Sequence, residues 1–323
     1  MSVVDASTPT LIVRAPTPAD VELVAELIIA SDIAEFGEPD SSIDDVRREW
    51  EDLDLSRDAW LVTLTDGRLV GYGYLWDRGG GRLSSEGYVH PDYEGRGIGT
   101  RLRRLIEARA AELAAQVPAG VRVVLRAGTS AHNAAARRFL EEQGYQVVRF
   151  FWRMQIELNG PPPAPRWPAG LTVRPMQLGR DEVAVFTALT EAFLDHWGSV
   201  PIPFEEWRKK YLDKPDVDTS TWFVVLDGDE PAAAVRCSRF LDMGWVDTLG
   251  VRRPWRKQGL GTALLYQVFD AFYQRGIPKI GLGVDAANPT GATRIYERAG
   301  MQVTRTFALY EKELRAGEDS HDA

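Results

Sequence analysis

The sequence predicts a tandem chain of two copies of one α/β domain. Three observations support this fold class. The chain has 323 residues, about twice the usual length of a single domain. An internal repeat has the period of a whole domain. Between the copies, the segment 159–170 contains five prolines, which favour a stiff, extended linker over a helix or strand.

Each copy contains the same succession of elements. It opens with a short strand ending in Val-Arg, then an amphipathic helix over 19–30 or 181–195. Two β-rich runs follow, joined by Asp66-Gly67 or Asp227-Gly228, and such turns mark antiparallel hairpins. A further strand runs into a glycine-rich loop and a helix, and a fifth strand, a second helix and a β-rich tail complete the copy. Corresponding residues keep a spacing of about 160 throughout.

These patterns set the expected domain boundaries. We expect an N-terminal domain over 1–158, a linker over 159–170, a second domain over 171–315 and a flexible tail over 316–323. No apolar run reaches the roughly 18 residues of a membrane span, and 1–10 does not resemble a signal peptide. We therefore expect a cytoplasmic protein.

Composition excludes several classes of function. The net charge of −9 argues against general binding to nucleic acid or to an anionic membrane, because such proteins present a basic face to phosphates. Cys237 is the single cysteine and the four histidines are scattered, so we expect no disulfide within the chain and no metal site. Any anionic ligand must be held locally.

Both copies have a glycine-rich loop between a strand and a helix. Closely spaced glycines let backbone N–H groups converge, and the helix N-terminus adds positive potential, so this loop favours pyrophosphate. Neither loop has the Gly-Lys-Ser/Thr of a P-loop, and Leu102 stands where a dinucleotide fingerprint needs its third glycine. Tight turns without a ligand are the alternative. The loops comprise Arg256, Lys257, Gln258, Gly259, Leu260, Gly261 and Thr262 in the second copy, and Gly95, Arg96, Gly97, Ile98, Gly99 and Thr100 after Val89 in the first.

The second loop resembles the acetyl-CoA motif of the GNAT superfamily, Arg/Gln-x-x-Gly-x-Gly/Ala. Arg256, Gly259 and Gly261 match it in full, whereas the first copy has Glu94 at the leading position. The resemblance extends over both copies, and the tandem arrangement looks like that of the mycothiol synthases. It implies a mixed, mostly antiparallel central sheet flanked by helices in each domain, with acetyl-CoA as cofactor.

The resemblance also implies roles for individual residues. Backbone N–H groups around Leu249, Gly250 and Val251 would hold the oxyanion. Asn288, and Asn133 in the first copy, would contact the cofactor. Tyr296 would protonate the departing thiolate, whereas Leu140 stands at the corresponding place in the first copy.

Asp247 and Glu86 are the candidate general bases, unless these strand carboxylates simply face solvent. Strict alternation along the strand would place Asp247, Leu249 and Val251 on one face and Thr248 on the other.

The segment 191–211 is expected to form the acceptor wall. Its aromatic rings and carboxylates suit a cationic amine, although a partly buried amphipathic helix would look alike. The predicted function is acetyl-CoA-dependent N-acetylation of a primary amine of a small molecule, with the active site in the second copy. The alternatives are an acyl-CoA sensor or regulatory module and a peptide or protein N-acetyltransferase. The predicted assembly is a monomer whose domains pair like a GNAT homodimer, or a homo-oligomer.

Overall fold

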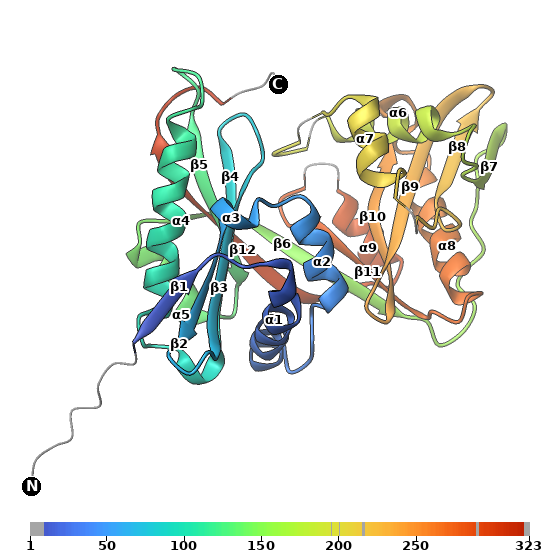
Figure 1. The fold of residues 1–323 in the computed structure, drawn as a ribbon. Coiled ribbons are helices and arrows are strands. Elements are labelled where there is room, and N and C mark those ends of the chain that lie inside the picture. The colour runs from blue at the N-terminus through green and yellow to red at the C-terminus, as the bar shows by residue number, and fades with distance from the viewer. Residues whose placement is uncertain (1–9, 195, 200, 215–216, 289–290, 320–323) are drawn as a thin grey trace, which may run out of the picture. The chain divides into compact units, whose positions relative to one another are not determined.

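The chain folds into two compact units (Figure 1). The computed structural model describes residues 10–194, 196–199, 201–214, 217–288 and 291–319. Met1–Val148 and Ala308–Ala323 form the first unit, and Arg149–Phe307 form the second. This division differs from the boundaries predicted from the sequence, which assigned 149–158 to the first domain and 308–315 to the second.

The first unit contains a six-stranded sheet in the order β1-β2-β3-β4-β5-β12. The strands β1 to β4 pair antiparallel, and β4 and β5 pair parallel. Its elements are β1 (Leu11–Arg14), η1 (Pro18–Asp20), α1 (Val21–Phe36), α2 (Ile43–Glu51), α3 (Leu55–Asp58), β2 (Ala59–Leu64), β3 (Leu69–Asp77), β4 (Arg82–Val89), η2 (Pro91–Tyr93), α4 (Ile98–Ala114), β5 (Val123–Ser130), α5 (Ala134–Glu142), the start of β6 (Gln146–Glu157) and the end of β12 (Gln302–Arg315).

The second unit repeats this plan in the order β7-β8-β9-β10-β11-β6. In this order, β10 and β11 pair parallel, and the other neighbouring strands pair antiparallel. The mixed, mostly antiparallel sheet predicted for each domain is confirmed. After the first part of β6, its elements are β7 (Leu171–Pro175), α6 (Glu182–Phe193), α7 (Phe204–Tyr211), β8 (Phe223–Asp227), β9 (Glu230–Phe240), β10 (Met243–Val251), η3 (Arg253–Trp255), α8 (Leu260–Tyr273), β11 (Lys279–Asp285), α9 (Ala292–Arg298) and the start of β12.

The last strand of each copy lies in the other unit. From Arg149 on, β6 belongs to the second unit, where Phe151–Glu157 pair with β11, although β6 ends the first copy. From Ala308 on, β12 belongs to the first unit, where Ala308 and Tyr310 are part of the buried core. The expected tail is partly ordered, because Glu318 pairs with Gly120 and Arg122, while 320–323 lie outside the described residues. A sequence repeat indicates where the strands are, but it does not indicate which strand each one pairs with.

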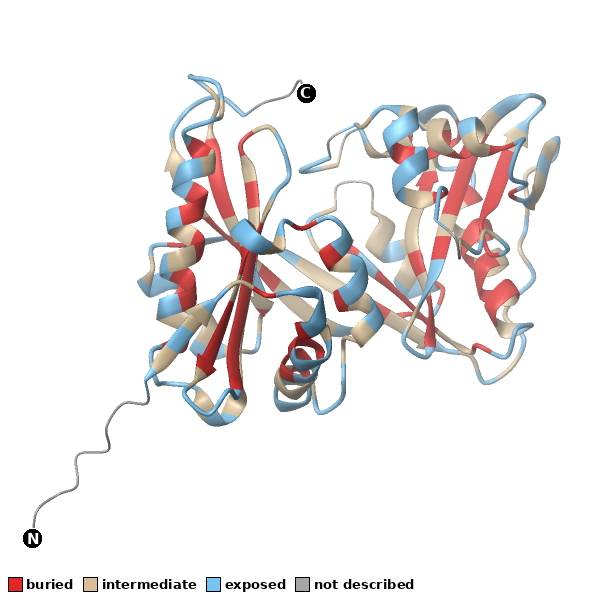
Figure 2. Cartoon of the chain, viewed as in Figure 1, coloured by how far each residue is buried: buried red, intermediate tan, exposed pale blue. Residues whose placement is uncertain are grey.

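Helices cover the sheet of each unit, and the buried residues lie on the facing surfaces (Figure 2). In the first unit α4 packs on β3, and a Cβ added to Gly71 would lie 2.6 Å from Ile98 Cγ2. Glycine in β3 therefore allows the close approach of α4. The helix α2 was not predicted, whereas α7 is the partly buried amphipathic helix given as the alternative for 191–211. No helix in the described part of the chain is long and apolar enough to span a bilayer.

An arginine–aspartate pair fastens the first strand of each unit. Arg14 donates through both terminal nitrogens to Asp20, at 2.8 and 2.5 Å, and Arg174 makes the same two-pronged contact with Asp181. Both carboxylates are buried, and each also accepts a backbone N–H of the turn that follows the strand. The hydrogen bonds from Arg14 hold the pKa of Asp20 well below its usual range. These pairs explain the repeated Val-Arg of the sequence.

We predict that Arg174→Ala lowers the free energy of unfolding by about 3 kcal/mol, because it leaves the Asp181 carboxylate buried without its partner. Urea denaturation followed by circular dichroism measures the change. Arg180→Ala is the matched control, since Arg180 is 64% exposed and 3.9 Å from Asp181; its cost should stay below about 0.5 kcal/mol. Equal costs for the two variants would contradict the assigned role.

Candidate active site

The site of the second unit lies where two parallel strands separate. The register of β10 with β11 runs from Gly244–Ile280 to Val246–Leu282 and ends there. Both strands continue beyond this point, β10 along β9 to Val251 and β11 along β6 to Asp285. The gap gives side chains and backbone of 247–251 access to a cavity.

A β-bulge turns Asp247 toward this gap. Along β9, Val246 pairs with Cys237 and Thr248 with the adjacent Arg236, so Asp247 is an extra residue on its strand. A bulge interrupts the alternation of side chains. Asp247, Thr248 and Leu249 therefore all line one cavity, and the prediction that Thr248 faces away from Asp247 is wrong.

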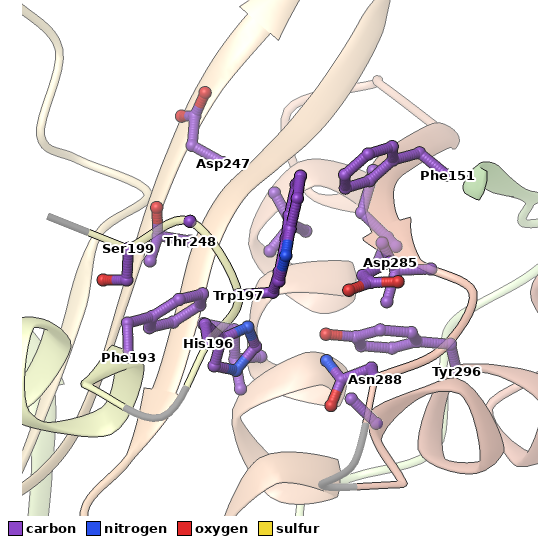
Figure 3. A pocket seen from close by; sticks show the side chains of 17 residues that line it. Phe151, Phe193, His196, Trp197, Ser199, Asp247, Thr248, Asp285, Asn288 and Tyr296 are labelled. Carbon is purple, nitrogen blue, oxygen red and sulfur yellow. The ribbon is translucent and has the colours of Figure 1, made fainter. Parts of the chain in front are cut away.

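The cavity has a volume of about 330 Å³ and brings four predicted site residues together (Figure 3). Asp247 and Leu249 come from β10, Asn288 from the loop after β11, and Tyr296 from α9. Figure 3 shows the hydroxyl of Tyr296 pointing into the cavity. Five residues of the predicted acceptor wall also line it: Phe193, His196, Trp197, Gly198 and Ser199.

Asp247 is a largely buried carboxylate with incomplete hydrogen bonding. Ser238 Oγ donates to its Oδ1 at 3.0 Å, and Arg236 Nη1 lies 3.5 Å from its Oδ2. This Oδ2 is buried and accepts no hydrogen bond from the described residues. Burial raises the pKa of Asp247, and the charge of Arg236 and the bond from Ser238 oppose the rise. The carboxylate can accept a proton more readily than an exposed aspartate can.

Tyr296 keeps its proton at neutral pH. Burial raises its pKa to about 12, so the phenol remains a proton donor facing the cavity. The second carboxylate of the cavity, Asp285, lies 3.4 Å from Arg149 Nε, and the Arg149 guanidinium lies 4.7 Å from the centre of the Trp197 ring. Sequence reasoning missed Arg236, Arg149 and Asp285, because their pairing depends on strand register.

The glycine-rich loop of the second unit leads directly into α8. Lys257 and Gly259 both have left-handed φ angles, of 63° and 88°, and Gly259 is the N-cap residue of the helix. A Cβ added to Gly259 would meet no atom within 4 Å, and one added to Gly261 would meet only ordinary contacts. Within the described structure, the backbone N–H groups of 257–262 have no recorded acceptor, as expected for a first helical turn. The loop therefore offers open donors to an anion.

Other predicted cofactor residues have structural contacts. Arg256 donates to the carbonyl oxygens of Val251 and Ala192, at 3.0 and 3.1 Å, and so ties the loop to β10 and α6. Gly250 faces α6, because a Cβ there would lie 2.7 Å from that of Ala192. None of the loop residues 256–262 lines the cavity. Their contact with a cofactor remains a prediction.

The loop of the first unit has the same backbone but different side chains. Gly95 and Gly97 take the left-handed φ angles that Lys257 and Gly259 take in the second, and Glu94 is exposed. The side chain of Asn133 caps α5 by accepting the N–H of Ala136, and it also donates to Glu35. Leu140, at the place of Tyr296, is buried in the core.

Glu86 lies past the point where β4 and β5 separate, and its charge acts on a second carboxylate. Glu49 of α2 accepts hydrogen bonds from Tyr74 at 2.9 Å and from Tyr72 at 3.3 Å. Burial, followed by the charge of Glu86, raises the pKa of Glu49 to about 7. Sequence reasoning named Glu86 and missed Glu49. No group of three or more potential metal ligands occurs among the described residues.

Comparisons with known proteins agree with this fold. The profile of the Acetyltransferase (GNAT) family matches residues 25–145 and 184–301. A mycothiol acetyltransferase from Thermobispora bispora is 31% identical over 262 residues, covering 79% of this chain and 84% of that protein. One from Nocardiopsis dassonvillei is 29% identical, covering 77% of this chain and 80% of that protein.

Two solved structures share the fold over almost the whole chain. A GCN5-related N-acetyltransferase from Sphaerobacter thermophilus is 39% identical with a TM-score of 0.86, covering 96% of this chain and 98% of that one. A tandem GNAT protein from the clavulanic acid biosynthesis pathway is 16% identical with a TM-score of 0.70, covering 96% of this chain and 100% of that one, and shares the fold alone.

The raised pKa of Glu49 predicts a pH-dependent stability of the first unit. The folded state holds a proton that the unfolded state loses above its ordinary pKa of 4.5, so the free energy of unfolding should fall as pH rises from 5 to 8. Glu49→Gln should remove about 1–3 kcal/mol of this fall. Urea midpoints across this pH range test it, with the exposed Glu51→Gln as control; an unchanged pH profile in Glu49→Gln would rule out the protonated carboxyl.

Proposed function

The chain belongs to the GNAT acetyltransferase family through both of its units, and from this premise we propose that the second unit carries the acetyl-transfer site. The chain is an acetyl-CoA-dependent N-acetyltransferase that acts on an amine of a small molecule. The observation that carries the assignment to the second unit is the shared cavity of Asp247 and Tyr296, a potential base and a potential acid.

The loop before α8 fits the phosphates of acetyl-CoA. Its open N–H groups over 257–262 and the N-terminus of α8 supply donors and positive potential for a pyrophosphate. Asn288 and the strand end 249–251 would hold the arm that leads from the phosphates to the cavity, since Leu249 and Asn288 line it. Acetyl-CoA supplies the acetyl group as a thioester. Arg256 would position the loop through its two carbonyl contacts.

The side chains of the cavity can move the protons that the transfer requires. Asp247 takes a proton from the acceptor ammonium through its carboxylate, directly or through water, because Asp247 lines the cavity. The free amine then forms the new N–C bond as the C–S bond breaks. Tyr296 would give its proton to the departing sulfur, and the excess proton on the amide nitrogen would return to the Tyr296 phenolate, directly or through water. Backbone N–H groups of 249–251 stabilise the developing negative charge on the carbonyl oxygen.

We assign a scaffolding role to the first unit. It lacks a hydroxyl at Leu140 and has the acidic Glu94 at the head of its loop, where negative charge disfavours phosphate. The names of the mycothiol acetyltransferase relatives support a small amine as acceptor. The predicted acceptor wall also supports a small amine, because its aromatic side chains Phe193 and Trp197 line the cavity.

We predict that Tyr296→Phe lowers kcat about 100-fold or more, the usual contribution of a positioned general acid. Acetyl-CoA binding should stay unchanged, because the ring remains in place. Thiol release from acetyl-CoA with a panel of primary amines measures turnover, and calorimetry measures binding. Tyr266→Phe is the matched control, since Tyr266 packs on the same core and does not line the cavity. Full activity in Tyr296→Phe would remove the phenol from the mechanism.

The two loops allow a paired test of the active half. Gly259 and Gly97 have similar left-handed φ angles and open surroundings, so glutamate at either costs about 1–2 kcal/mol of backbone strain. Gly259→Glu should also abolish acetyl-CoA turnover, because its carboxylate repels the phosphates. Gly97→Glu should leave turnover near that of the wild type. The reverse result would assign catalysis to the first unit.

A further inference from the structure

A second cavity opens beside the first and differs from it in charge. It has a volume of about 210 Å³ and shares Phe193, Ser199 and Thr248 with the first cavity. The first cavity is lined by the carboxylates of Asp247 and Asp285. The second is lined by the cations Lys210 and Arg236, and none of its described lining residues is acidic. A ligand spanning both cavities therefore meets negative charge at one end and positive charge at the other.

Arg236 lies at the boundary between the two cavities. Its Nη1 is 3.5 Å from Asp247 Oδ2, and its Nη2 is 3.5 Å from Thr248 Oγ1. The guanidinium stacks 4.1 Å from the centre of the Tyr211 ring, which fixes its plane beside the second cavity. Both polar contacts are long, so the guanidinium retains N–H donors for a further anion. Its side chain is only 16% exposed, which strengthens its attraction for a negative group.

Lys210 adds a second positive charge, and no carboxylate of the described residues neutralises it. It is exposed on α7, and its Nζ lies 5.4 Å from the centre of the Tyr211 ring. No carboxylate lies within ion-pair distance of Lys210 in the described structure. Its neighbour Lys209 is also exposed but does not line the cavity.

We propose that the acceptor is an amino acid or a similar amine with an adjacent carboxylate. Its ammonium lies in the first cavity beside Asp247, and its carboxylate lies in the second between Arg236 and Lys210. The short separation of Asp247 and Arg236 matches the short separation of the ammonium and the carboxylate in an α-amino acid. Each charge of the acceptor would therefore lie beside a protein group of opposite charge. Leu189, Ile202 and Trp207 give the second cavity an apolar surface for the rest of the molecule. This proposal rests on the proposed acetyl transfer in the second unit.

The test compares acceptors that differ only in the carboxylate. Thiol release from acetyl-CoA is measured with a panel of amino acids, their amides and the corresponding decarboxylated amines. We expect kcat/KM about tenfold or more higher for the acids, the effect of one charge-assisted contact. Amides or simple amines that react as well as the acids would overturn the proposal. Preference for aminoethyl phosphate over every amino acid would overturn the assignment to a carboxylate.

Variants at the two neighbouring lysines locate the anion site. Lys210→Gln should raise KM for the amino acids about tenfold with little change in kcat, and should leave the decarboxylated amines unaffected. Lys209→Gln should change neither. An equal loss with both acceptor classes, or no change with the acids, would overturn the site. If no amine in the panel releases thiol, the proposed transferase function itself fails, an outcome distinct from equal rates with acids and amines.

Discussion

The end of the pairing between β10 and β11 is the constraint on which the rest of the second unit depends. Parallel strands that stayed in register to their ends would leave no gap for a ligand within the sheet. Because the ladder ends at Val246 and Leu282, the bulge at Asp247 opens onto a cavity, and α9 brings Tyr296 to the same space. The first unit separates in the same way after Ser85 and Ala127. The gap is thus a property of the fold, and the side chains around it decide the chemistry.

Comparison of the two units separates scaffold from chemistry. The arginine–aspartate pairs and the left-handed loop residues recur in both, because they fix backbone geometry. The residues at the gap differ. Tyr296 corresponds to the buried Leu140, and Glu86 raises the pKa of Glu49, whereas Asp247 lies beside the cation Arg236. The two units thus share the residues that fix the backbone and differ in the side chains around the gap.

Sequence reasoning succeeded where local chemistry decides structure. The hairpin turns, the strand–loop–helix frames and the presence of Tyr296 and Asp247 near one another followed from motifs and family resemblance. It failed where the structure depends on the register between strands. The bulge that turns Asp247 arises from pairing with β9, and Arg236 reaches Asp247 only through that pairing. The exchange of β6 and β12 likewise cannot be predicted from the sequence, since a repeat does not specify which copy a strand pairs with.

The exchange of β12 has a consequence for the order in which the protein is made. The ribosome finishes Val148 about 160 residues before Ala308, a delay of about 8–30 s at ordinary elongation rates. During that interval the nascent first unit lacks the strand that lies beside β5, and an open strand edge invites association with other chains. The unit that is synthesised first is therefore completed only after the second unit, because its sheet includes β12.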